Sequence, residues 1–209
     1  MRCIGIYGSS GFGREVLPLV RQQHEAAGTK IVFIDDNAEP SGATMTFEAF
    51  ARLPHAEKRV TIAIANSAVR ETLAENCRAN DIGFVEVRAS NSLVLDNVQI
   101  GEGAILCGFT HLTSDIRIGR HFHANIYSYV AHDCVIGDFV TFAPGVMCNG
   151  NVHVEDHVYV GTGAIIKQGT PDKPRVIGKG AVIGMGAVVT KDVAPGETVI
   201  GNPARPMQR

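Results

Sequence analysis

Histidine is unevenly distributed in this 209-residue sequence, since six of the eight lie between positions 111 and 157. Imidazole titrates near neutral pH, so histidine is the side chain best suited to take a proton from a reacting group. Most of the six are expected to be ordinary surface or turn residues. His132 stands out because it lies between the apolar positions Val130 and Ile136 and is followed directly by Asp133. We single it out as the candidate for proton transfer.

A six-residue repeat surrounds this histidine. From Val94 to Ile166 every sixth residue is apolar, thirteen positions in all. The phase slips after Ile166 and resumes at Ile177, and the polar stretch 167–176, with two prolines, is predicted to be an excursion loop. A fixed six-residue period is typical of a parallel β-helix, in which each hexad forms one short strand and a turn. Residues 91–209 are therefore predicted to form a β-helix domain with a C-terminal tail.

Residues 1–90 lack this period and instead alternate between strand and helix patterns. The expected strands are 3–7, 30–34, 60–64 and 84–87, and the expected helices are 14–24 and 67–80. This order predicts a small Rossmann-like α/β domain with a parallel sheet. The glycine-rich turn 8–13 opens the first helix, where backbone N–H groups favour an anion. Asp35 and Asp36 end the second strand, at the edge where such sheets bind ligands.

Composition excludes several classes of protein. The net charge is −2, which does not suit a nucleic-acid-binding protein. Five cysteines without a CxxC pair argue against a disulfide framework and indicate a reducing, cytoplasmic setting. No apolar run is long enough to span a membrane, and the N-terminus does not resemble a signal peptide.

Several segments together resemble a known family. They are Tyr7-Gly8-x-Ser10-Gly11-x-Gly13, Ile34-Asp35-Asp36, His132-Asp133-Cys134-Val135-Ile136-Gly137, Cys148-x-Gly150-Asn151-Val152, the Ile-Gly and Val-Gly steps of the repeat, and Gly201-Asn202-Pro203-Ala204. Over nearly its whole length the chain resembles the hexapeptide-repeat acetyltransferases that modify sialic acid or nucleotide-linked amino sugars such as bacillosamine precursors. The resemblance implies a left-handed coil, a homotrimer, and acetyl-CoA bound between adjacent helices.

The same resemblance implies roles for individual residues. His132 would be the general base, Asp133 would orient it and raise its basicity, and the Gly150 N–H would stabilise the oxyanion. Because neighbouring strand residues point to opposite faces, pairing of His132 with Asp133 needs a bend or a contact across subunits. The residues implied in binding the nucleotide-linked sugar are Ser10, Gly11, Phe12, Asp35, Asp36 and Ala65. Those implied in binding acetyl-CoA are Thr141, Thr162, Gly163, Gly184 and Met185.

Three residues depart from the family's pattern. Phe12 and Thr141 stand where the family often has histidine, and Ala65 replaces a glycine that approaches the ligand. The first and last of these departures bear on which nucleotide or sugar is bound.

We expect an acetyl-CoA-dependent N-acetyltransferase that acts on a nucleotide-linked amino sugar in bacterial surface glycan biosynthesis. One alternative is O-acetylation of sialic acid or of another sugar hydroxyl. Another is a non-enzymatic protein that binds sugar nucleotides, although a scaffold has no need of a base at His132.

A γ-type carbonic anhydrase is a further alternative, since His121-x-His123 on one strand face suggests a zinc site. That family has a histidine where this chain has Tyr127, and it lacks a nucleotide-binding front domain. No metal is therefore expected.

Overall fold

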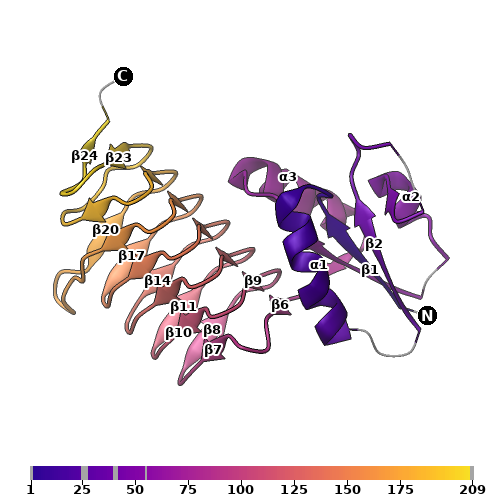
Figure 1. Cartoon of the computed structure of the whole chain (residues 1–209), viewed down its shortest axis with the longest axis horizontal. Helices are drawn as coiled ribbons and strands as arrows, with labels where there is room; N and C mark the ends of the chain where they lie inside the picture. Colours follow the sequence, from indigo (N-terminus) through magenta and orange to yellow (C-terminus); the bar gives the residue numbers. More distant parts are fainter. Residues whose placement is uncertain (1, 25–27, 40–41, 55, 208–209) are drawn as a thin grey trace. The chain divides into compact units, whose positions relative to one another are not determined.

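The computed structural model describes residues 2–24, 28–39, 42–54 and 56–207 and divides the chain into two compact units. The first unit is Met1–Arg88 and the second is Ala89–Arg209. Figure 1 shows the elements of each unit.

The first unit is built on a parallel sheet with strand order β3-β2-β1-β4-β5. The strands are β1 (Arg2–Tyr7), β2 (Thr29–Ile34), β3 (Thr44–Met45), β4 (Glu57–Ile62) and β5 (Gly83–Phe84). The helices are α1 (Gly11–His24), α2 (Phe47–Ala51) and α3 (Ser67–Ala79). The central strand β1 is buried from Cys3 to Tyr7, as expected for a sheet covered on both faces.

The turn between β1 and α1 depends on glycine. A β-carbon on Gly13 would lie only 1.9 Å from the carbonyl oxygen of Gly8, so no other residue fits there. Gly8 itself has φ +104°, in the region that favours glycine. The close approach lets α1 begin directly after β1.

Sequence periodicity misjudged the shortest elements of this unit. The strand predicted over 84–87 is wrong, because β5 ends at Phe84 and Val87–Arg88 form a separate strand, β6. Val85 and Val87 are both buried. The apolar alternation therefore continues past the end of β5, and the sequence gives no sign that the strand stops at Phe84. The predicted strand 60–64 begins earlier and ends at Ile62. Neither β3 nor α2 was predicted, since two strand residues and one helical turn are too short to show a period.

The second unit is a parallel β-helix with three sheets. The first sheet contains β7 (Leu93–Val94), β10 (His111–Leu112), β13 (Tyr129–Val130), β16 (Met147–Cys148), β19 (Ile165–Ile166) and β22 (Val188–Val189). The second contains β8 (Val98–Ile100), β11 (Ile116–Ile118), β14 (Val135–Ile136), β17 (Val152–Val154) and β20 (Arg175–Ile177). Within this unit, the third contains β9 (Ile105–Leu106), β12 (His123–Ala124), β15 (Thr141–Phe142), β18 (Tyr159–Val160), β21 (Val182–Ile183), β23 (Thr198–Ile200) and β24 (Arg205–Pro206).

Strand register explains the six-residue period. Leu112 pairs with Val130, which pairs with Cys148, so one coil takes eighteen residues and three hexads. The repeated apolar residue of each hexad faces inward, and these residues form one continuous core. The successive coils are visible as stacked rungs in Figure 1.

Residues at the corners between sheets adopt left-handed backbone angles. At the corner between the first and second sheets these are Asn97, Asp115, Asp133 and Asn151, with φ between 55° and 57°. Asparagine and aspartate tolerate this region better than most residues. At the corner between the second and third sheets, Phe139 stacks between the rings of His121 and His157, with centroid distances of 5.1 and 5.4 Å.

The excursion loop is shorter than predicted. Strand β20 begins at Arg175, whose N–H donates to the carbonyl of Asn151 at 2.9 Å, so the loop ends at residue 174 instead of 176. Arg175 and Val176 pair with β17 before the inward-facing Ile177 resumes the apolar phase. Periodicity located Ile177 but not the start of pairing.

No helix in the described residues has the length and apolar character needed to cross a membrane.

Candidate functional site

His132 and Asp133 lie at the corner that follows β13. The Nδ1 atom of His132 is 2.7 Å from Oδ2 of Asp133, and both side chains are more than half exposed. The bend that the sequence required is present within one chain, because Asp133 has φ 57° and reverses the backbone. With Nδ1 bonded to the carboxylate, the Nε2 atom of His132 is left to accept a proton.

Gly150 occupies the same corner one coil later. A β-carbon on this residue would lie 2.5 Å from Cε1 and Nε2 of His132. The imidazole therefore lies against the bare α-carbon of Gly150. In the part of the chain that the structure describes, the Gly150 N–H donates to no acceptor. The predicted base and the predicted oxyanion donor are adjacent in space although eighteen residues separate them.

A cavity of about 360 Å³ opens beside this corner on the second sheet. Asp133 lines it together with Arg117 from β11, and Asn97 and Asp115 form part of its rim. Asn97 donates to Asp115 at 2.5 Å, which fixes that part of the wall. The cavity adjoins the His132 corner through Asp133.

The residues predicted to bind acetyl-CoA lie elsewhere in the β-helix. Thr162 and Gly163 follow β18, and Gly184 and Met185 follow β21, so these four share the corner between the third and first sheets. The Gly186 N–H donates to the Thr162 carbonyl at 2.8 Å, which joins the two coils. Thr141 is separate from them, since it is buried in β15. Within one chain, the structure does not bring this set to the His132 corner.

The first unit holds a cavity of about 350 Å³ at the carboxyl ends of β1, β2 and β4. Among the predicted substrate residues, Ser10, Asp35 and Asp36 line it, whereas Gly11, Phe12 and Ala65 do not. Sequence reasoning missed the apolar wall formed by Ile64, Val69 and Leu73. The signal for the last two was their spacing of four residues on α3, which places them on one helix face.

Both carboxylates of this cavity already accept hydrogen bonds. Asp36 accepts from the hydroxyl of Tyr7 and, at 2.7 Å, from the N–H of Phe47 at the start of α2. Asp35 accepts from the Ser9 hydroxyl at 2.5 Å, and this bond holds the pKa of Asp35 below its usual value. These bonds hold the acidic pair in place, and each oxygen of Asp36 keeps a lone pair for a ligand.

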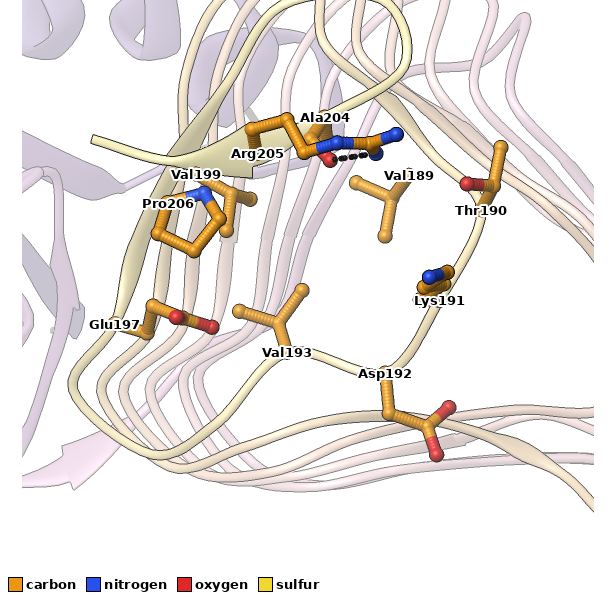
Figure 2. A pocket seen from close by; sticks show the side chains of 10 residues that line it. All are labelled: Val189, Thr190, Lys191, Asp192, Val193, Glu197, Val199, Ala204, Arg205 and Pro206. Atoms are coloured by element: carbon orange, nitrogen blue, oxygen red, sulfur yellow. Dashed lines mark hydrogen bonds between the residues drawn. The ribbon is translucent and has the colours of Figure 1, made fainter. Parts of the chain in front are cut away.

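A further cavity, of about 320 Å³, lies at the last coils of the β-helix (Figure 2). None of the residues predicted for the site lines it. Its wall consists of Val189, Thr190, Lys191, Asp192, Val193, Glu197, Val199, Ala204, Arg205 and Pro206. Arg205 donates to the carbonyl of Ala204 at 2.9 Å within this wall.

The two histidines weighed as metal ligands are both buried, and His121 takes part in the stack with Phe139. Among the described residues no group of three or more His, Cys, Asp or Glu side chains is placed to hold a metal.

Comparison with known proteins found matches to the first unit alone and to the whole chain. The model of the PglD N-terminal domain family matches residues 3–77. GDP-perosamine N-acetyltransferase from Escherichia coli O157:H7 is 46% identical over 216 residues, which cover 100% of this chain and 98% of that protein.

Solved structures show the same architecture. WeeI from Acinetobacter baumannii AYE is 57% identical with a TM-score of 0.96, and the match covers 99% of this chain and 100% of that one. The acetyltransferase domain of PglB from Neisseria gonorrhoeae FA1090, in complex with acetyl coenzyme A, is 27% identical with a TM-score of 0.85 and 99% coverage of both chains.

Proposed function

The chain belongs to the hexapeptide-repeat sugar acetyltransferases of the sialic acid O-acetyltransferase and UDP-bacillosamine-type N-acetyltransferase family, and from this we propose that it acetylates the amino group of a nucleotide-linked amino sugar. It has the fold expected of that family, a Rossmann-like α/β unit followed by a left-handed parallel β-helix, and it uses acetyl-CoA as co-substrate. The observation that carries the proposal is the identity of 46%, over the whole chain, to a GDP-perosamine N-acetyltransferase.

In the proposed mechanism His132 is the general base. Its Nε2 atom takes a proton from the sugar amino group as the nitrogen attacks the thioester carbonyl. A C–N bond forms, and the C–S bond then breaks. The imidazolium returns the proton to the departing CoA sulfur. Asp133 holds the Nδ1–H, which keeps the ring in the tautomer that presents a lone pair at Nε2 and stabilises the imidazolium.

Gly150 supplies the oxyanion donor in this mechanism. Its N–H has no competing acceptor among the described residues, and it lies at the corner that the His132 ring covers. A donor that is already in place when charge develops lowers the barrier without reorganisation.

The first unit would hold the nucleotide. Its cavity lies at the carboxyl ends of parallel strands, beside the N-terminus of α1, where phosphates are favoured. Asp35 and Asp36 would face the ribose or the base, and the wall of Ile64, Val69 and Leu73 would contact the base ring.

The proposal includes a homotrimer, because the His132 corner and the corner of Thr162 and Gly184 are different corners of the β-helix. A neighbouring copy would bring its acetyl-CoA residues to the base. One residue from each strand of the first sheet faces outward, and together these residues form an apolar file along the sheet. This largely apolar surface supports packing against a neighbouring copy. Its members, in register, are Leu93, His111, Tyr129, Met147, Ile165 and Val188.

The test is release of CoA thiol from acetyl-CoA with GDP-perosamine, UDP-linked and dTDP-linked amino sugars, and free sialic acid. We expect turnover with one of the amino sugars. His132→Ala should lower kcat/KM by about a hundredfold or more. His153→Ala, on the outward side of β17, is the matched control and should retain activity.

Each contrary result has a defined meaning. Turnover with sialic acid alone would make the reaction O-acetylation and refute the proposed acceptor. An active His132→Ala variant would refute the base while leaving the acceptor intact.

A further inference from the structure

A buried thiol touches both backbone segments of the proposed site. The Sγ atom of Cys134, which is 1% exposed, lies 3.2 Å from the carbonyl oxygen of Asn149 and 3.6 Å from that of His132. The first of these residues precedes the oxyanion donor and the second carries the base. One core side chain therefore contacts the backbone of both.

Because of peptide geometry, the contact at the Asn149 carbonyl also sets the direction of the Gly150 N–H. The carbonyl of Asn149 and the N–H of Gly150 belong to the same peptide unit, and in a planar trans peptide they point in opposite directions. Because the carbonyl points inward to the buried thiol, the N–H points outward from the core, on the side of the peptide where the substrate would lie. A rotation of this peptide would turn the donor away from that side.

Stronger contacts hold the side chain of Asn149, whereas its carbonyl is contacted by two thiols. Its side-chain amide donates to the Ile166 carbonyl at 2.8 Å, and its Oδ1 accepts from the Tyr129 hydroxyl at 2.9 Å. At the carbonyl itself, the nearer thiol is Cys134, since the Sγ of Cys148 is 3.9 Å away.

We propose that Cys134 is a positioning residue for acetyl transfer, and that its thiol, by donating to the Asn149 carbonyl, fixes the peptide that presents the Gly150 N–H to the oxyanion. This inference rests on the proposed function, since it takes Gly150 as the oxyanion donor. Donation to the carbonyl also polarises the peptide and strengthens its N–H as a donor. The ordinary alternative is that Cys134 only fills space in the core.

The test compares Cys134→Ala, which removes the donor, with Cys134→Ser, which retains one. In Cys134→Ala we expect kcat to fall by about tenfold, with KM for acetyl-CoA unchanged and the acidic limb of the pH profile in place, because the His132 imidazole keeps its contact with Asp133. Cys134→Ser should recover most of the loss. In ¹H–¹⁵N spectra the Gly150 amide should shift in the alanine variant and return toward the wild-type position in the serine variant.

Val154→Ala is the control for loss of core volume, since Val154 is 2% exposed and lies on β17 away from the corner. It should lower the melting temperature without changing kcat. The inference is overturned if Cys134→Ala keeps the wild-type kcat and the Gly150 amide does not shift, or if Val154→Ala loses as much activity. The amide measurement does not depend on turnover, so failure to acetylate any amino sugar would refute the proposed function and leave this contact to be judged separately.

Discussion

The imidazole of His132 occupies the space that a side chain at position 150 would need. Any β-carbon there would lie 2.5 Å from two ring atoms, a distance that real β-carbons do not tolerate. The ring cannot stay in place beside even an alanine. The identity of residue 150 therefore controls the position of the proposed base as well as the proposed oxyanion donor.

Gly150→Ala should accordingly lower kcat/KM by about tenfold or more, because displacing a catalytic group by an ångström is costly. The melting temperature should change little, since the ring is exposed and can swing out. Steady-state kinetics and thermal unfolding would measure both. Gly83→Ala is the control, because nothing lies within 4 Å of a β-carbon at that position. Wild-type kinetics in Gly150→Ala would show that the ring position is unimportant.

Among the elements, the Ile-Gly steps of the repeat have a structural cause. The carboxylate of Asp138 lies over the α-carbon of Gly119, and that of Asp156 lies over Gly137, so a β-carbon at either glycine would meet a carboxylate oxygen within 2.5 Å. Asp138 accepts from the backbone N–H of Arg120 at 2.7 Å and from its guanidinium at 2.6 and 2.8 Å. These bonds join one coil to the next.

The Asp138 contacts predict a pH-dependent contribution to stability. Burial tends to raise the pKa of Asp138, but the hydrogen bonds from Arg120 outweigh it and the net pKa is lowered. A carboxyl whose pKa is lower in the folded chain stabilises the fold above its unfolded pKa, and this stability is lost as pH falls through the folded pKa. Asp138→Asn should cost about 1 kcal/mol of unfolding free energy at neutral pH, and the difference from wild type should shrink below about pH 4.

Urea unfolding at pH 7 and pH 3 would measure this difference. Asp172→Asn, in the exposed excursion loop, is the control and should match wild type at both values. A gap between Asp138→Asn and wild type that is as large at pH 3 as at pH 7 would contradict the assignment.

At the scale of the whole molecule, the β-helix could be predicted far better than the unit before it. Each coil repeats the same inward positions, so thirteen apolar residues in phase identify the fold by themselves. The α/β unit has no such repetition. Its shortest elements, β3 and α2, have too few residues to produce a periodic pattern in the sequence. The corner pair of His132 and Asp133 was found from a motif. The contact of Cys134 with Asn149 was not, because fifteen residues separate them and only the coil register brings them together.

The division of the proposed site between two corners predicts that assembly and activity are coupled. Met147→Glu would place a charge in the middle of the apolar file on the first sheet, where Met147 is 42% exposed. We expect sedimentation to change from three times the mass of one chain to the mass of a single chain, with loss of turnover. Val176→Glu, on the second sheet, should leave both unchanged. A fully active single-chain species would refute the shared site.

The last strands of the β-helix bear on whether two molecules can stack end to end. Strand β24 runs antiparallel to β23, with Pro206 opposite Val199, and the N–H of Ala204 donates to Val188 of β22. Stacked parallel coils would otherwise offer rows of unpaired N–H and C=O groups to a second molecule. A proline has no N–H to offer, so Pro206 interrupts the row of donors on β24. The segment 204–206, which lines the cavity in Figure 2, therefore also acts against end-to-end growth into fibrils, a recurrent hazard of repetitive β architectures.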